Sequence, residues 1–177
     1  MITKRRSVFS LSLIIMVYLV GTTCAIEYET AMHHILNFNV GSQYTIVDEP
    51  PLYVSESNKW INQVELQGDD EKQAIIAVTE YEFPQSDISL ESIRQSKEDN
   101  IKELGVGGVT FNTTTINGET ALTYHVPRQT VPRGFTFPEI YAYSYWYDNS
   151  TEVGVSVNGL GKAVYDDLLK MKIKEKA

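Results

Sequence analysis

Apolar and polar residues alternate along much of this chain, and the alternation predicts a mainly β protein. Residues 44–47 are rich in β-forming side chains and stop at an acidic, Pro-containing turn. Residues 60–66 and 74–83 alternate with an acidic turn between them, which predicts a hairpin. Residues 26–39 are weakly patterned and could be a tether or a first short element, and we expect 26–42 to form a weakly structured tether.

Two segments have the period of an amphipathic helix. Apolar residues recur at helical spacing over 90–104, Asp87 or Ser89 can cap the start, and Gly105 suits the C-terminal cap. A second apolar stripe predicts a final helix over 162–174, with a broad face that docks on the sheet.

Four further strands are expected between these helices. Segments 109–116 and 119–126 flank Asn117-Gly118, the strongest short hairpin signal, and segments 140–147 and 152–158 form a second pair. The order of three strands, a helix, four strands and a helix predicts an α+β fold. We expect one domain over 43–177, with an antiparallel sheet of about 6–7 strands and two main helices packed on it.

This order of elements, together with some local phrases, resembles the PsbP-like fold. The phrases are SLESI at 89–93, TINGETALTY at 115–124, and the strand pair at 141–148 and 153–158 before the final helix. The group includes the photosystem II protein PsbP, the Mog-type Ran-binding factors and small secreted or lipid-anchored prokaryotic proteins. The resemblance implies an α/β/α sandwich that binds partners or assists assembly, and no functional residue transfers from it.

The first 25 residues predict export. A basic start at 4–6, an apolar run at 11–20 and small residues at 21–25 are typical of a secretory signal cleaved after Ala25. Two alternatives stay open: residues 7–26 carry no charge and could remain as an uncleaved anchor, or Cys24 could be lipidated. All three interpretations place the domain outside the cytoplasmic membrane, with membrane contact only through this segment.

Composition narrows the classes of function. The formal charge is −8, from 15 basic and 23 acidic residues. Three of the basic residues and no acidic residue lie in the first 25, so cleavage would leave a charge of −11. This balance disfavours nucleic-acid binding through a basic surface. One cysteine, Cys24, excludes a disulfide framework and a Cys-rich zinc site.

The motifs of common catalytic and cofactor sites are missing from the sequence. Gly159 to Lys162 lacks the spacing of a phosphate loop, and no Gly-x-Ser-x-Gly nucleophile elbow occurs. His33, His34 and His125 lack metal-ligand spacing and are expected to be surface or packing residues. We therefore expect no cofactor and no metal, and favour a non-catalytic protein over an enzyme.

A long loop at 127–138 is the first candidate contact surface. It carries Arg128 and Arg133, two of the three arginines beyond the leader, together with Phe135 and Phe137. Arginine and aromatic side chains are typical anchors of protein interfaces.

The aromatic strand at 140–147 is the second candidate. Tyr141, Tyr143 and Tyr145 share one face, and Trp146 lies on the other. Exposed, these rings would contact a partner or a sugar; covered by helices, they would form core.

Two sequons make Asn112 and Asn149 candidate glycosylation sites. The sequence as a whole predicts a secreted or membrane-tethered binding or assembly module of the cell envelope, contacting a protein or surface component. The alternative is an extracytoplasmic small-ligand binder or hydrolase with a pocket between sheet and helix.

Overall fold

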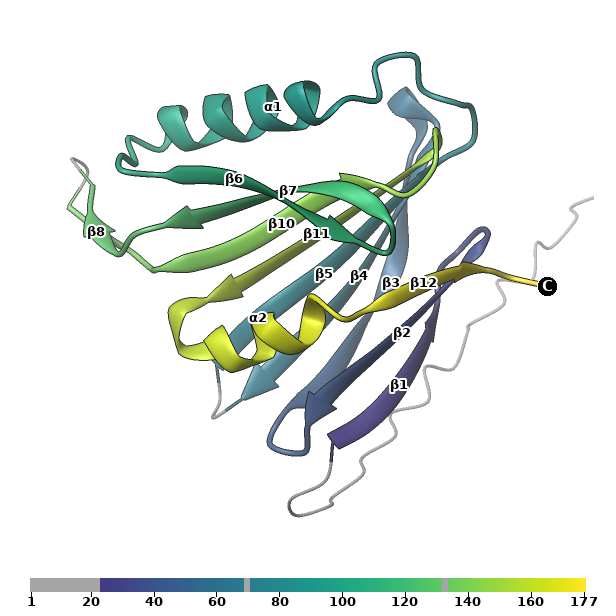
Figure 1. Ribbon diagram of the computed structural model, residues 1–177, viewed down its shortest axis with the longest axis horizontal. Coiled ribbons are helices and arrows are strands. Elements are labelled where there is room, and N and C mark those ends of the chain that lie inside the picture. The colour runs from purple at the N-terminus through teal and green to yellow at the C-terminus, as the bar shows by residue number, and fades with distance from the viewer. Residues whose placement is uncertain (1–22, 69–70, 132–133) are drawn as a thin grey trace, which may run out of the picture.

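The computed structural model describes residues 23–68, 71–131 and 134–177, most of which lie in antiparallel sheets (Figure 1). The main sheet contains, in chain order, β3 (Thr45–Val54), β4 (Lys59–Gly68), β5 (Glu71–Tyr81), β6 (Thr110–Ile116), β7 (Glu119–Val126), β10 (Ile140–Trp146) and β11 (Thr151–Asn158). A smaller sheet contains β1 (Thr23–Glu29), β2 (His34–Gly41) and β12 (Lys172–Glu175). A ribbon pairs β8 (Gln129–Thr130) with β9 (Thr136–Phe137).

The main sheet has the spatial order β3-β4-β5-β11-β10-β7-β6, and the small sheet has the order β1-β2-β12. The helices are α1 (Leu90–Glu103) and α2 (Lys162–Leu168), with 3-10 turns η1 (Ser55–Ser57) and η2 (Gly159–Gly161). The predicted α+β class, with a largely antiparallel sheet and two helices, is confirmed.

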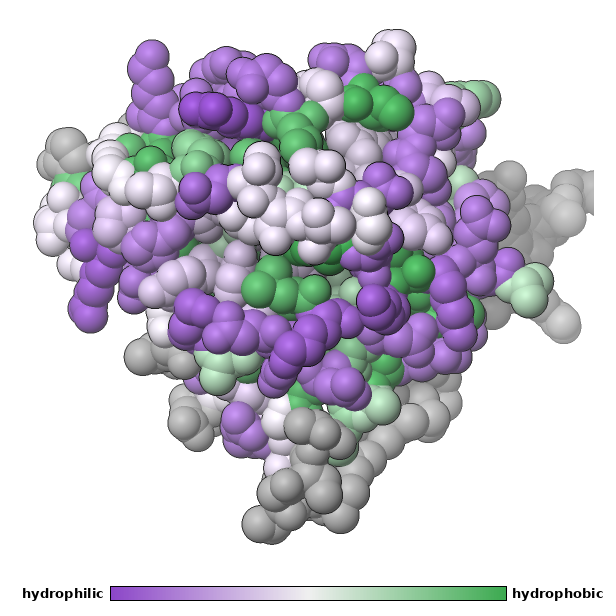
Figure 2. Space-filling view, in the orientation of Figure 1, coloured by the Kyte–Doolittle hydropathy of each residue, from purple (hydrophilic) through white to green (hydrophobic). Residues whose placement is uncertain are grey.

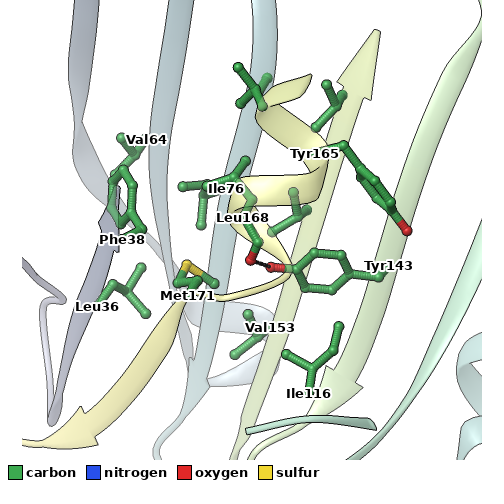
Figure 3. Close-up of a cluster of buried hydrophobic side chains, with 14 of the residues drawn as sticks. Leu36, Phe38, Val64, Ile76, Ile116, Tyr143, Val153, Tyr165, Leu168 and Met171 are labelled. Carbon is green, nitrogen blue, oxygen red and sulfur yellow. Dashed lines mark hydrogen bonds between the residues drawn. The ribbon is translucent and has the colours of Figure 1, made fainter. Parts of the chain in front are cut away.

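The two helices lie on opposite faces of the main sheet. Tyr143 of β10 packs in the main core with Leu168 of α2 and with Phe38 of the small sheet (Figure 3). Tyr124 of β7 faces the other way and joins a second cluster that includes Ile101 of α1. Helix α2 and the small sheet therefore cover one face, and α1 covers part of the other. Figure 2 shows that hydrophilic residues surround separate apolar spots on the side that carries α2 and the small sheet.

Local signals place several elements where the sequence predicts them. Ser89 caps α1, because its side chain accepts from the Ser92 backbone while the Ser92 side chain accepts from Ser89. Asn117 and Gly118 both adopt positive φ, 56° and 89°, as the turn between β6 and β7 requires.

The expectation of a tether at 26–42 is wrong, because this segment forms the hairpin of β1 and β2. Leu36, Phe38 and Val40 point inward and are at most 3% exposed. They alternate with asparagines, so the period of two was present in the sequence over a short run. Burial of this stripe against the main sheet is what orders the segment.

The final helix is shorter than predicted. It ends at Leu168, and the chain turns back into β12, which pairs with β2. Met171 and Ile173 are buried and Lys172 between them is exposed. These residues therefore follow the two-residue period of a strand after the chain turns back at the end of α2.

Strand β3 is longer than predicted and runs through Pro50 and Pro51. It lies at the edge of the main sheet, where a missing backbone N–H is tolerated, and its register shifts between Glu49 and Leu52.

Truncation of Leu168, the side chain through which α2 packs in the main core, should destabilise the whole protein. Leu168 is fully buried, so we expect Leu168→Ala to lower the free energy of unfolding by about 2–5 kcal/mol. Leu104→Ala is the control: its side chain is 43% exposed, and we expect a change of about 0.5 kcal/mol or less. Urea unfolding followed by tryptophan fluorescence measures both, and equal losses would contradict the packing described here.

Candidate functional site

The loop at 127–138 is held in place at both ends. Val131 is 2% exposed and belongs to the second core cluster. Gln129 fixes the base, because its amide accepts from the Gly107 backbone N–H at 2.9 Å and donates to the Gly107 carbonyl at 2.8 Å. The short β8–β9 ribbon closes the loop. These contacts hold the described parts of the loop, residues 127–131 and 134–138, against the body of the protein.

The loop presents two of its four predicted contact residues. Arg128 is exposed and Phe135 is 46% exposed. Phe137 is half-buried and packs against the second core cluster, so it supports the loop as much as it could contact a partner. Arg133 lies outside the described residues.

The aromatic strand does not form one contact surface. Tyr143 and Tyr145 are fully buried, which corrects the expectation that they could bind a partner. The Tyr143 hydroxyl donates to the Leu168 carbonyl at 2.7 Å, as the dashed line in Figure 3 marks. Tyr145 accepts from the Asn117 side chain at 2.8 Å, and burial raises the pKa of Tyr145 to about 12. Both rings serve the core, where helix and small sheet cover them.

The other two aromatic candidates are half-buried and lie far apart along β10, on opposite faces. Tyr141 stacks on His125 with ring centroids 4.7 Å apart, and both side chains reach Glu139 at 2.8 Å. The hydrogen bonds from His125 and Tyr141 lower the pKa of Glu139. Trp146, at the other end of the strand, lies 5.8 Å from the Tyr81 ring.

Both sequons lie at accessible places. Asn112 is exposed in the middle of β6, which is an edge strand of the main sheet. Asn149 is exposed in the turn between β10 and β11. Both side chains are therefore accessible to a glycan.

A buried carboxylate lies where the small sheet meets the main sheet, and sequence reasoning missed it. Glu80 is 1% exposed at the end of β5. Among the described residues its two oxygens accept five hydrogen bonds of 2.7–3.0 Å, from donors at Thr30, Met32, His33, His34 and Asn62. Four of these five donors belong to segment 30–34, the turn between β1 and β2.

The hydrogen bonds determine the charge of this carboxyl group. Burial alone would raise the pKa of Glu80, but the hydrogen bonds from His34 and from the rest of the β1–β2 turn outweigh burial and lower the pKa to about 2. Glu80 is therefore ionised at neutral pH, and its Oε1 accepts a hydrogen bond from His34 Nδ1–H at 2.9 Å.

The alternating pattern of β5 and β4 already indicated the buried position of Glu80. Glu80 continues the inward stripe of Ala74, Ile76 and Val78 on β5, and Asn62 continues the inward stripe of β4. A charged residue on the buried side of an alternating strand indicates a partnered buried group.

The outer side of His34 lies in a small pocket. The pocket has a volume of about 310 Å³ and is lined by His33, His34, Asp148, Ser150, Glu175 and Lys176. His34 is 2% exposed, and its Nε2 has no hydrogen-bond partner in the described part of the chain. The sequence predicts that His34 is a surface or packing residue. It is buried like a packing residue, but one side of its ring also lines a pocket.

A larger depression of about 670 Å³ lies between the small sheet and the end of α2. It is the nearest match to the expected alternative of a pocket between sheet and helix. Its charged residues include Asp167 and Lys170, which pair with each other at 3.0 Å. The depression is therefore a surface hollow in which these two charged side chains already bind each other.

The described residues lack both a cluster of metal ligands and a membrane-spanning helix. No group of three or more His, Cys, Asp or Glu residues in ranges 23–68, 71–131 and 134–177 is placed to hold a metal ion. Within the same ranges, no helix has the length and apolarity to span a membrane.

Comparison of the chain with protein-family models, with curated proteins and with solved structures finds no match.

The Glu80 network predicts a defined acid sensitivity. A carboxyl group with a pKa of about 2 in the folded protein and 4.5 when unfolded stabilises the folded state above pH 4.5. That contribution, roughly 3 kcal/mol, should be lost as the pH falls from 4.5 to 2.

We expect Glu80→Gln to lower the free energy of unfolding at pH 7 and to flatten its dependence on pH between 2 and 4.5. Asp166→Asn is the control, because Asp166 is 57% exposed and forms only a surface pair with Lys162. Urea unfolding at a series of pH values measures both, and a Gln variant with the wild-type slope would contradict the role assigned to Glu80.

Proposed function

We propose that this chain is a non-catalytic binding or assembly module of the cell envelope, secreted or tethered by its N-terminal segment. Export rests on the leader pattern of residues 1–25, which the sequence alone supplies. The binding role rests on the loop at 127–138, and a protein or surface component outside the cytoplasmic membrane is the partner we propose.

The observation that carries this proposal is an exposed Phe135 on an anchored loop. Interfaces are enriched in aromatic residues and arginine, and Arg128 is exposed on the same loop. Val131 and Gln129 hold the backbone in place, so binding would sacrifice little conformational freedom. In Figure 1 the strand β8 marks this loop, which projects at one end of the main sheet.

We extend the proposal to a PsbP-like arrangement. Its support is the seven-stranded antiparallel sheet with α1 and α2 on opposite faces, and the order of the elements from β3 onward. Proteins of that group mostly bind partners or assist assembly, which agrees with a role that needs no catalytic motif.

The loop proposal predicts a selective loss of binding. We expect Arg128→Ala/Phe135→Ala to reduce recovery of the partner at least tenfold in capture from the native envelope fraction, because the variant removes both anchors. Quantitative mass spectrometry of the captured proteins measures it.

A matched control uses the same two residue types elsewhere. Phe83 is 62% exposed and the Arg94 side chain is 48% exposed, both near the start of α1, so Phe83→Ala/Arg94→Ala should retain the partner. Equal recovery of every interactor by both double variants would rule out the loop as the contact surface.

The leader proposal predicts a shortened exported chain. We expect the intact mass of the protein recovered from outside the cytoplasmic membrane to correspond to a chain beginning at Ile26, because small residues occupy positions 23 and 25. A full-length mass would indicate the uncleaved anchor, and a lipid-modified chain beginning at Cys24 would indicate lipidation. Full-length protein in the cytosol would contradict export.

A further inference from the structure

A histidine nitrogen and a carboxylate oxygen, His34 Nε2 and Asp148 Oδ2, face each other in the pocket beside His34. Glu80 also accepts from the backbone N–H groups of Met32 and His33, so its oxygens act as acceptors and Nδ1 of His34 donates to them. When the His34 ring is neutral, its lone pair is then on Nε2. That Nε2 is buried, has no hydrogen-bond partner within the described residues, and lies 3.5 Å from Asp148 Oδ2. A buried lone pair next to a carboxylate oxygen is unfavourable unless something positive lies between them.

Both groups are held in position by contacts on their far sides. Glu80 fixes the His34 ring through Nδ1, and the Tyr147 ring meets it edge-on at 5.3 Å. Asp148 Oδ1 accepts from the Ser150 backbone N–H at 2.6 Å and from the Ser150 hydroxyl at 2.9 Å. The hydrogen bonds to Ser150 engage Oδ1 and leave Oδ2 on the side of His34.

The charges around the pocket favour a cation. Glu175 pairs in register with His34 across β12 and β2, so both side chains lie on the same side of the small sheet. Lys176, the basic residue of the lining, donates to the Thr30 carbonyl and lies 3.8 Å from Glu29. Its ammonium group is therefore engaged by partners outside the pocket lining.

The spacing of the two acceptors distinguishes between cations. Two ligands about 2.05 Å from a tetrahedral metal ion lie about 3.3 Å apart, close to the separation of His34 and Asp148. An ammonium nitrogen or a water about 2.8 Å from both atoms would subtend an angle of about 77°, far from tetrahedral. The geometry therefore suits a small metal ion with short bonds to nitrogen and oxygen.

We propose that this pocket binds a divalent transition-metal ion of the zinc type through His34 Nε2 and Asp148 Oδ2. The Glu80–His34 pair is the carboxylate–histidine arrangement that orients imidazole ligands in metal sites. Water molecules complete the coordination, because the described residues place only two donor atoms at ligand spacing. The ion would connect β2 to the β10–β11 turn, and so the small sheet to the main sheet.

The test is calorimetric titration of the EDTA-treated, dialysed protein with ZnCl₂ at pH 7.5. We expect one ion per chain, and a loss of affinity of roughly tenfold or more in Asp148→Asn with an unchanged melting temperature of the metal-free protein. Long-range ¹H–¹⁵N NMR should show the His34 Nε2 resonance shifting on addition of zinc, while Nδ1 stays protonated.

The other histidine–carboxylate pair supplies the control. His125 Nε2 already contacts Glu139 at 2.8 Å, so His125→Gln/Glu139→Gln should bind zinc like the wild type. The proposal is overturned if no zinc binds, if Asp148→Asn binds equally well, or if the double variant loses the ion. It is also overturned if NMR shows a proton on His34 Nε2 that zinc does not displace, because the proton would then be the cation between the two groups.

Discussion

The junction between the two sheets depends on one buried carboxylate. Glu80 lies at the end of β5 in the main sheet, and four of its five described hydrogen bonds come from the β1–β2 turn at 30–34. An ionised group in the interior is tolerated only when its oxygens are fully bonded. The position of the turn is therefore coupled to the charge of this one group, in addition to the apolar packing of β2 against the main sheet.

The same group determines the environment of His34. Glu80 holds the ring through Nδ1 at 2.9 Å, and Nε2 then faces Asp148 Oδ2 at 3.5 Å in the pocket lined by both residues. The buried carboxylate of the junction is fully hydrogen-bonded, whereas Nε2 on its outer side has no hydrogen-bond partner among the residues that the structure describes. The loop at 127–138 shows the opposite arrangement: Gln129 is hydrogen-bonded to the backbone of Gly107, and the exposed side chains of the loop include Arg128 and Phe135.

The contact candidates were predictable to different degrees. The exposure of Arg128 agrees with the sequence, because arginine is rarely accommodated in a core. The exposure of Phe135 runs against the usual burial of phenylalanine, and only the structure shows it. The tyrosines of β10 were ambiguous, since alternation shows which side chains share a face but not what covers that face. Tyr143 and Tyr145 are buried because α2 and the small sheet pack over them. The Glu80 site was not predicted, because its donors are 18 to 50 residues away in sequence.

The sequence alone specifies the caps, turns and strands that depend only on neighbouring residues. The cap at Ser89, the turn at Asn117-Gly118 and the alternating strands depend on neighbouring residues, so the sequence predicts them directly. Tertiary structure decided the rest. Residues 26–42 contain a local hairpin, but its order depends on distant segments: β2 pairs with β12 at the other end of the chain and buries its apolar side in the main core. Residues 172–175 form a strand for the same reason. Burial against distant elements is a property of the assembled fold, and no local window of sequence contains it.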